Sequence, residues 1–340
     1  MNLGQLSTTA MGVMPHTDVD RALELALSLD VPFWPQLPLY SFYEDMYVQA
    51  SENFPGIILD EDKRTIKFSK EKFYKELPNI IENYENEDIF DVSNNYSVVY
   101  PKFLKKDLSS YSAIRGQMEG PISFGFNIVD ENDRPILFDD EVRSFMYEFM
   151  AKRINVQLKR LKQKNKNAFM FIDEPGLQFL FSALSGYNDV FARRDIDEFL
   201  AQIERPRGIH LCGNPDWDFL FGFDMDIASI DIYTNKKVIP LYGRSIKSFL
   251  ERGGIIVWGI VPTNYEDFEG ETIATLKKLL NEIWNVVLKS GIDRDELLSK
   301  SMLSPATCCL VNKDKEKTVE KAFSILKKLS YDLKEEYRLS

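Results

Sequence analysis

Short apolar runs alternate with longer amphipathic segments along this chain of 340 residues. This alternation is typical of parallel β/α units, in which each strand is covered by helices. The candidate core strands are Thr8–Val13, Val31–Gln36, Gln117–Ser123, Ala168–Asp173, Gly208–Cys212, Ile227–Ile232, Ile255–Ile260 and Lys300–Ser304. Eight strands with helices between them predict an α/β fold of the (β/α)8 TIM barrel type, and a doubly wound open sheet is the alternative.

Apolar residues recur at helical spacing between these runs. The segments Asp139–Lys162, Thr272–Leu288 and Thr318–Leu333 each carry an apolar stripe and are predicted to be helices. Asp18 precedes Val19–Leu27 and is a candidate N-cap for a further helix.

The stretch from Pro55 to Arg115 exceeds what a bare barrel needs. Gly56–Leu59 and Thr65–Phe68 predict a hairpin with a charged turn, and Glu71–Tyr84 predicts a helix. We therefore predict one barrel domain over residues 1–340 with an insertion at about 55–115, after the second strand. Loops at the carboxyl ends of barrel strands build the active site, so an insertion there is placed to cover a substrate.

Charge and composition narrow the function. The chain has 42 basic and 53 acidic residues, so its formal charge is 42 − 53 = −11. A nucleic-acid partner is not expected, because phosphate binding needs a basic face. A membrane partner is not expected either, because no apolar run approaches ~18 residues and the N-terminus has no signal-peptide pattern. Three cysteines make no disulfide framework, which favours a cytoplasmic protein.

The sharpest local motif is His210-Leu211-Cys212 at the end of the fifth predicted strand. Residues two apart in a strand face the same side, and imidazole nitrogen and thiolate sulfur are good zinc ligands. By itself, a structural histidine beside a buried cysteine remains the simpler interpretation.

A second cysteine motif, Cys308-Cys309, follows the eighth predicted strand. Two small buried residues are the simpler interpretation of this pair alone. The carboxyl ends of all barrel strands meet at one rim, however, so this motif and His-x-Cys are expected to converge there. Together they favour a metal site.

Carboxylates end two further strands. Asp231 follows the sixth strand and is a candidate ligand or a supporting partner of one, with a simple strand-end carboxylate as the alternative. Asp173 and Glu174 end the fourth strand before Pro175; such a pair can bind an amine or do acid–base work. The alternative is that they begin a helix over Leu177–Leu184.

Seven motifs occur in a fixed order along the chain: Thr9–Thr17, Gly120–Ser123, Ile172–Pro175, His210–Cys212, Ile230–Asp231, Val261–Thr263 and Cys308–Leu310. In order and spacing they resemble the catalytic half of cobalamin-independent methionine synthase, in its short "core" form. They are also similar to the wider superfamily that holds uroporphyrinogen decarboxylase and corrinoid-dependent thiol methyltransferases.

This resemblance implies a zinc enzyme that methylates a thiol such as homocysteine. The zinc ligands would be His210, Cys212, Asp231 and Cys308, with Asp where the family has Glu and with Cys309 as an alternative to Cys308. Asp173 would bind the substrate amine and act as the catalytic carboxylate. The backbone of Met11, Gly12 and Val13 would contact the substrate, although the family has Ser at the position of Val13.

Other positions of the family pattern differ in this chain. The family's second amine-binding Glu falls on Tyr40, its folate contacts fall on Phe179 and near Asn127, and its proton-donating His has no counterpart near Trp258. The resemblance therefore implies a methylcorrinoid or a corrinoid protein as the methyl donor rather than methyl-tetrahydrofolate. Because Tyr40 cannot replace the second amine-binding carboxylate, coenzyme M or another thiol stays open as the substrate.

Two rival functions remain. A decarboxylase of the uroporphyrinogen type would need a basic N-terminal loop, and the stretch from Thr8 to Leu29 holds only Arg21. A non-catalytic barrel with a structural zinc would need four protein ligands and no open position. The number of protein ligands on the metal distinguishes this second rival from the enzyme.

Overall fold

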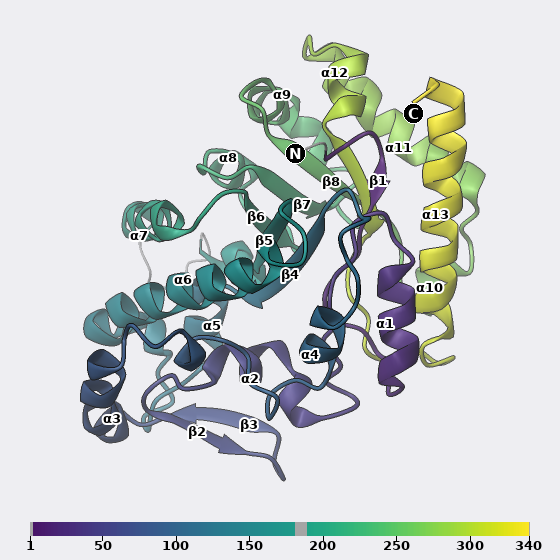
Figure 1. Cartoon of the computed structure of the whole chain (residues 1–340). Helices are drawn as coiled ribbons and strands as arrows, with labels where there is room; N and C mark the ends of the chain where they lie inside the picture. Colours follow the sequence, from purple (N-terminus) through teal and green to yellow (C-terminus); the bar gives the residue numbers. More distant parts are fainter. Residues whose placement is uncertain (1–2, 181–188, 340) are drawn as a thin grey trace.

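The computed structural model describes residues 3–180 and 189–339, and its centre is a curved parallel sheet (Figure 1). The strands of this sheet lie in the order β1-β9-β8-β7-β6-β5-β4. Their bounds are β1 Ser7–Thr8, β4 Ile114–Glu119, β5 Ala168–Asp173, β6 Arg207–Leu211, β7 Ile227–Asp231, β8 Ile255–Val261 and β9 Ser301–Pro305.

The segment 31–36 takes the eighth position and closes the sheet into a barrel. It lies between the first strand and β4, with parallel bridges from Gln36 to Val13 and from Phe33 to Arg115. Its backbone also hydrogen-bonds on both sides, from Val31 N to the carbonyl of Thr8 at 2.9 Å and from Arg115 N to that of Pro32 at 3.0 Å. The predicted TIM-barrel fold is confirmed.

Three predicted strands differ from the observed ones. Val31–Gln36 forms no regular strand and pairs through the isolated bridges given above. The strand predicted at Gln117–Ser123 begins three residues earlier and ends four residues earlier, because Pro121 begins helix α5 (Pro121–Asn127) after Gly120. β1 ends at Thr8, and the chain beyond it continues as irregular backbone that pairs with the closing segment. The other predicted core strands agree with β5 to β9 to within one residue at each end.

Helices surround the sheet on its outer face (Figure 1). They include α1 (Val19–Leu27), α4 (Val99–Leu104), α6 (Asp140–Lys162), α7 (Asp189–Gln202), α8 (Trp217–Phe221), α9 (Gly243–Glu251), α10 (Tyr265–Phe268), α11 (Ile273–Lys289), α12 (Arg294–Ser299) and α13 (Lys317–Tyr337). The predicted helices α6, α11 and α13 are present, and Asp18 caps α1 by accepting from the amides of Asp20 and Arg21. None of the helices within the described ranges is both long and apolar enough to cross a bilayer.

The helix expected over Leu177–Leu184 is only partly covered by the structure. Its first residues form a 3₁₀ helix, η4, over Pro175–Phe179. Residues 181–184 lie outside the described residues.

The stretch between segment 31–36 and β4 contains the predicted hairpin and helix. β2 (Ile57–Asp60) pairs antiparallel with β3 (Thr65–Phe68), and α3 (Lys70–Glu82) follows. The hairpin lies beyond the carboxyl ends of the barrel strands, since Phe68 N donates to Val129 O at 3.0 Å, just after α5. Arg64 also donates to Pro38 O, just after the closing segment, at 2.7 Å.

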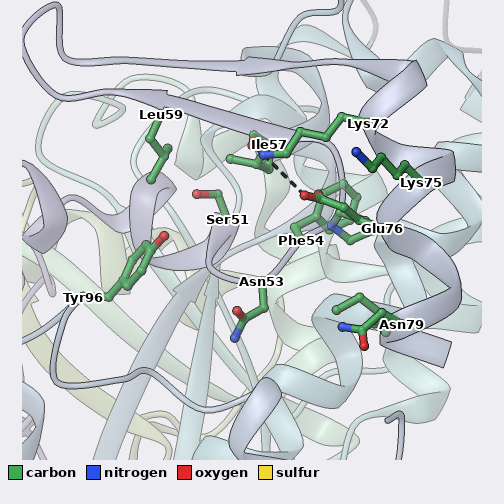
Figure 2. Close-up of a pocket in the computed structure, with 12 residues that line it drawn as sticks. Ser51, Asn53, Phe54, Ile57, Leu59, Lys72, Lys75, Glu76, Asn79 and Tyr96 are labelled. Carbon is green, nitrogen blue, oxygen red and sulfur yellow. Dashed lines mark hydrogen bonds and ion pairs between the residues drawn. The ribbon is translucent and has the colours of Figure 1, made fainter. Parts of the chain in front are cut away.

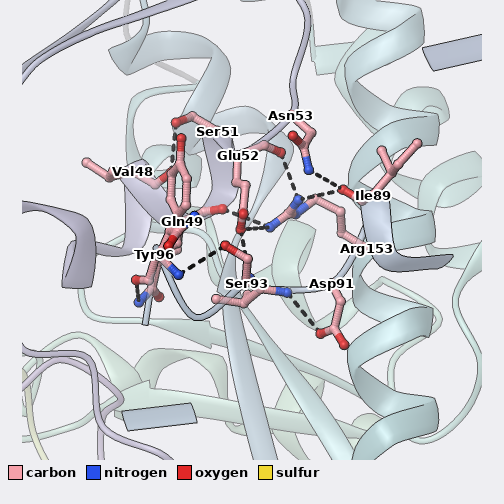
Figure 3. Close-up of polar contacts among 12 residues, drawn as sticks. Val48, Gln49, Ser51, Glu52, Asn53, Ile89, Asp91, Ser93, Tyr96 and Arg153 are labelled. Atoms are coloured by element: carbon pink, nitrogen blue, oxygen red, sulfur yellow. Dashed lines mark hydrogen bonds and ion pairs between the residues drawn. The ribbon is translucent and has the colours of Figure 1, made fainter. Parts of the chain in front are cut away.

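A buried arginine fixes the short helix α2 (Met46–Ser51) against α6 (Figure 3). Arg153 on α6 donates to the carbonyls of Gln49 at 2.9 Å and Glu52 at 2.8 Å. The Glu52 carboxylate lies 3.8 Å from the same guanidinium and accepts from Ser93 N at 3.1 Å. These contacts position α2, which carries Tyr47 to the rim of the barrel beside Glu119.

A cavity of about 560 Å³ lies between α2, the hairpin and α3, away from the sequence-predicted residues (Figure 2). It is lined by Ser51, Asn53, Phe54, Pro55, Ile57, Leu59, Lys72, Lys75, Glu76, Asn79, Ile80 and Tyr96. Several of its polar groups already have protein partners: Lys72 donates to Ile57 O, and Glu76 accepts from Gly56 N. We assign no catalytic role to this cavity.

Candidate functional site at the carboxyl rim of the barrel

Four neighbouring strands place polar residues at one height inside the barrel. Glu119 on β4 is paired in register with Asp173 on β5, Asp173 with His210 on β6, and His210 with Ser229 on β7. Residues paired in register on parallel strands point to the same face of the sheet. This face is the barrel interior, because Arg115, four residues before Glu119, packs across it on Phe33.

The remaining predicted metal ligands lie just above this layer. Asp231 ends β7 two residues after Ser229, and Cys212 follows β6 two residues after His210, so both continue the same face. Cys308 lies in the loop after β9, and the charges of Cys308, Asp173 and Asp231 all act on the Cys212 thiol. The structure thus brings the predicted residues to one rim. Among the described residues, however, no three donor side chains are close enough to hold a single metal ion.

The histidine is neutral and held in a fixed orientation. Its Nδ1 lies 3.0 Å from the hydroxyl oxygen of Ser229, and burial lowers the pKa of His210 to about 3. Nδ1 is thereby engaged and Nε2 remains for a ligand. A neutral imidazole with its second nitrogen engaged is the usual state of a metal-binding histidine.

Both rim thiols are protonated in the metal-free protein. Burial raises the pKa of Cys308 to about 11 and holds the pKa of Cys212 further above its ordinary range. By surface area Cys308 is exposed, whereas Cys212 is half-buried. A bound cation would deprotonate such thiols.

Asp231 carries an unsatisfied buried oxygen. Its Oδ1 accepts from Thr234 N at 3.1 Å, while Oδ2 is buried with no hydrogen-bond partner among the described residues. Burial raises the pKa of this carboxyl to about 7. Imidazole, two thiols and a free carboxylate oxygen match Zn²⁺ in donor type, although the donors are not gathered around one point.

The two adjacent cysteines differ in direction. Cys309 Sγ donates to Val311 O at 3.4 Å, and the acid acting on it is Glu266. The acids acting on Cys308 are instead Asp173 and Glu119. The orientation favours Cys308 as the rim thiol.

The predicted carboxylate pair divides into two roles. Glu174 accepts from Ile122 N at 3.0 Å and from Ser123 N at 2.9 Å and Oγ at 2.6 Å, so it caps α5. The backbone carbonyl of Asp173 accepts from Gly120 N at 2.8 Å, whereas its side-chain carboxyl accepts no hydrogen bond from any described residue. Burial, opposed by Arg115 and reinforced by Glu174, raises the pKa of Asp173 to about 7. Asp173 is therefore the one available to a ligand.

The predicted backbone contact also has free groups. The amide N–H groups of Met11, Gly12 and Val13 donate to no acceptor among the described residues, although Gly12 O accepts from Gln36 N at 2.9 Å. A Cβ at Gly12 would lie 2.5 Å from Gln117 Cγ, so the close approach requires glycine. Three consecutive free amides can bind a carboxylate.

The positions that depart from the family pattern offer no substitute chemistry. Tyr40 and Phe179 have half-exposed side chains, at 47% and 53%. Trp258 is fully buried and donates to Ser301 Oγ at 2.8 Å.

Sequence reasoning missed Glu119 and Ser229. Glu119 is the last residue of β4, but the predicted strand began three residues late and placed it in mid-strand. Its position directly before Gly120-Pro121, where the strand must stop, was the available signal.

No family model and no curated protein matches the sequence. Solved structures share the fold, among them two that align over nearly the whole chain. A methyltransferase from Methanosarcina mazei superposes with a TM-score of 0.59 at 13% identity, covering 96% of this chain and 94% of its own. A B12-independent methionine synthase from a Shewanella species, in complex with selenomethionine, has a TM-score of 0.54 at 12% identity, covering 99% and 100%.

Proposed function

We propose that this protein is a zinc-dependent methyltransferase whose methyl acceptor is a thiol, with homocysteine favoured. The observation that carries the proposal is the convergence of two thiols, a neutral histidine and an unsatisfied carboxylate at the carboxyl rim. Enzymes built on TIM barrels have their active sites at this rim. The fold shared with a methyltransferase and a methionine synthase supports the same conclusion.

His210, Cys212 and Cys308 would hold the zinc, and Asp231 would act as a fourth ligand or as a partner of one. When bound, zinc supplies the Lewis acidity that turns a substrate thiol into a thiolate at neutral pH. Ser229 fixes the ring of His210 through Nδ1. The free amides of Met11–Val13 would orient a carboxylate on the substrate.

We further propose a methylcorrinoid, free or on a partner protein, as the methyl donor. A folate donor leaves as an amine that needs protonation, whereas a corrinoid leaves as cobalt(I) and needs none. Trp258 is buried near the position of the family's acid and has no ionisable group to donate. A missing general acid costs on the order of 10²–10⁴ in rate, which a folate donor would suffer and a corrinoid donor would not.

The test combines a metal assay with a transfer assay. Zinc-loaded protein is incubated with homocysteine and either methylcobalamin or methyl-tetrahydrofolate, and methionine is measured. We expect about one zinc per chain, turnover with the corrinoid, and absent or far slower turnover with the folate. The double variant His210→Ala/Cys212→Ser is expected to lose both the metal and the turnover while keeping the fold.

Three outcomes would contradict parts of this proposal. Full zinc occupancy in the double variant would contradict the assignment of His210 and Cys212 as zinc ligands. Brisk turnover with the folate alone removes the donor assignment. A zinc held by four protein ligands, with no turnover on either donor, favours a structural site, in which the free oxygen of Asp231 would be the fourth ligand.

A further inference from the structure

Two carboxyl groups face each other across the ends of β4 and β5. Glu119 and Asp173 are paired in register, on adjacent strands that lie ~4.8 Å apart. Their side chains are 3% and 8% exposed, and both point into the barrel. Nothing in the family resemblance assigns a role to Glu119.

The Tyr47 hydroxyl interacts with the Glu119 carboxyl, but one carboxyl oxygen has no partner among the described residues. This oxygen, Oε1, is buried. Glu44 provides a contrast at 1% exposure, because Ser97, Gln49 and Val98 N all donate to its carboxylate. A buried acceptor without a donor destabilises a fold, so its presence at a rim points to a ligand that supplies the donor.

The groups around this pair favour a positive charge between them. The charges acting on Glu119 come from Asp173, Glu174 and Asp45, and the Tyr47 hydroxyl interacts with the same carboxyl. Among the described residues, the cation acting on Asp173 is Arg115, which lies two layers below it in the barrel. Arg115 is already engaged by other acceptors, since it donates to Thr9 Oγ1, Gln117 Oε1 and Ala10 O.

We propose that Glu119 and Asp173 together bind the protonated amine of the thiol substrate, so that the methyl acceptor is an amino-acid thiol and not an anionic thiol that lacks an amine. This inference rests on the proposed function and narrows its substrate class. Glu119 supplies, from β4, the second carboxylate that the family has at the position of Tyr40. The free amides of Met11–Val13 would take the substrate carboxylate, which completes recognition of a zwitterion.

The transfer test compares L-homocysteine with 4-mercaptobutanoate, which has the same chain without the amine. We expect the wild type to prefer homocysteine in kcat/KM by at least about 100-fold, the effect of two charge-assisted hydrogen bonds. Glu119→Gln should reduce this preference by about 10- to 100-fold, chiefly through the homocysteine value, and leave 4-mercaptobutanoate almost unchanged. Asp173→Asn should act in the same direction.

Glu44→Gln is the matched control, because it neutralises an equally buried carboxyl that the protein satisfies. It should lower the melting temperature and leave the homocysteine preference unchanged. Glu119→Gln should leave the melting temperature unchanged or raise it, and it should reduce the homocysteine preference. A loss of preference that accompanies unfolding equally in both variants would contradict a recognition role for Glu119.

A binding test separates this inference from the proposed function. Calorimetry compares methionine with 4-(methylthio)butanoate, and it needs no methyl transfer. Preferential binding of methionine that Glu119→Gln abolishes supports the amine site even if no transfer is found with any donor. Transfer to both thiols at equal kcat/KM, or equal or absent binding of the two ligands, overturns the amine site while leaving methyl transfer to be decided by its own assay.

Discussion

The floor and the rim of the barrel interior are built from the same strands. They differ in their side chains, because the floor is apolar and the rim contains buried polar groups that lack hydrogen-bond partners among the described residues. The floor is a buried apolar cluster of Leu3, Val31, Ala113, Phe169, Phe171, Ile227, Val257 and Met302. The rim begins only two residues further along the strands, with Asp173 following Phe171 on β5 and Ser229 following Ile227 on β7. A step of two residues along each strand thus separates the apolar floor from the polar rim.

The floor stabilises the fold, whereas the buried polar groups of the rim reduce its stability. Every floor residue is buried against other apolar side chains, which is the favourable arrangement for a core. At the rim, Glu119 Oε1 and Asp231 Oδ2 are buried without partners among the described residues, and burial holds the pKa of the Asp173 carboxyl near neutrality. Buried unsatisfied groups concentrate where a ligand completes them, so the rim is the functional end of the barrel.

The largest stability effect should come from the floor. Phe169→Ala removes a fully buried ring that packs on Phe171, and we expect a loss of about 3–5 kcal/mol in the free energy of unfolding. Urea denaturation measures it. Asp173→Asn, four residues along the same strand, should cause no comparable loss of stability at neutral pH, because it removes a buried ionisable group. Comparable losses in the two variants would remove the distinction between floor and rim.

Within the rim, the satisfied carboxylate should matter more for folding than the free one. Glu174→Gln weakens the three hydrogen bonds that cap α5, and we expect a loss of about 1–3 kcal/mol. Glu119→Gln replaces a carboxyl whose free oxygen has no donor among the described residues, so it should be neutral or stabilising. Thermal melts of the two variants side by side decide the point, and a larger loss in the Glu119 variant would be the contrary result.

The pH dependence of stability sharpens the same contrast. Asp173 has an ordinary pKa of 3.8 that burial raises to about 7 in the folded protein, so the folded state holds the proton more tightly than the unfolded state. Its contribution to stability is therefore present at low pH and lost as pH rises from about 4 to about 7.

Asn cannot titrate, so the stability of Asp173→Asn relative to wild type should rise with pH over that interval, by at most about 1.4 kcal/mol per pH unit. Urea unfolding of the metal-free protein at a series of pH values measures this difference. For the floor variant Phe169→Ala, the difference from wild type should stay constant with pH. A flat profile for Asp173→Asn would show that its carboxyl is ionised in the folded state.

The sequence predicted the barrel because hydrophobic periodicity is a local property of the chain. A short apolar run such as Ala168–Asp173 between helical segments indicates a buried strand, and this strand has the predicted bounds. Segment 31–36 was predicted as a strand from the same pattern, yet its prolines at 32 and 35 have no N–H and limit it to isolated bridges.

The site was predictable in its donor types and not in its geometry. His210 and Cys212 are identified by their spacing, and their place at a strand end follows from the fold. Glu119 could not be found by type alone, because an ordinary-looking glutamate becomes distinctive only when register places it against Asp173 and burial leaves its oxygen without a donor. Such pairing is a property of two strands that are 54 positions apart in the chain (173 − 119 = 54) and cannot be read from either one.

The smallest expected effect tests which of two adjacent thiols belongs to the rim. Cys309 is directed toward Val311 O and Glu266, whereas the Cys308 thiol acts on Cys212 at the rim. Cys309→Ala should therefore keep the zinc content of the wild type and change stability by less than ~0.5 kcal/mol. Cys308→Ala should lose the metal with an equally small effect on the metal-free fold, because its side chain contributes no floor packing. Metal analysis after dialysis reads out both variants. Retention of zinc by Cys308→Ala together with its loss from Cys309→Ala would reverse the assignment, and it would place the loop after β9 in a different orientation when the metal is bound.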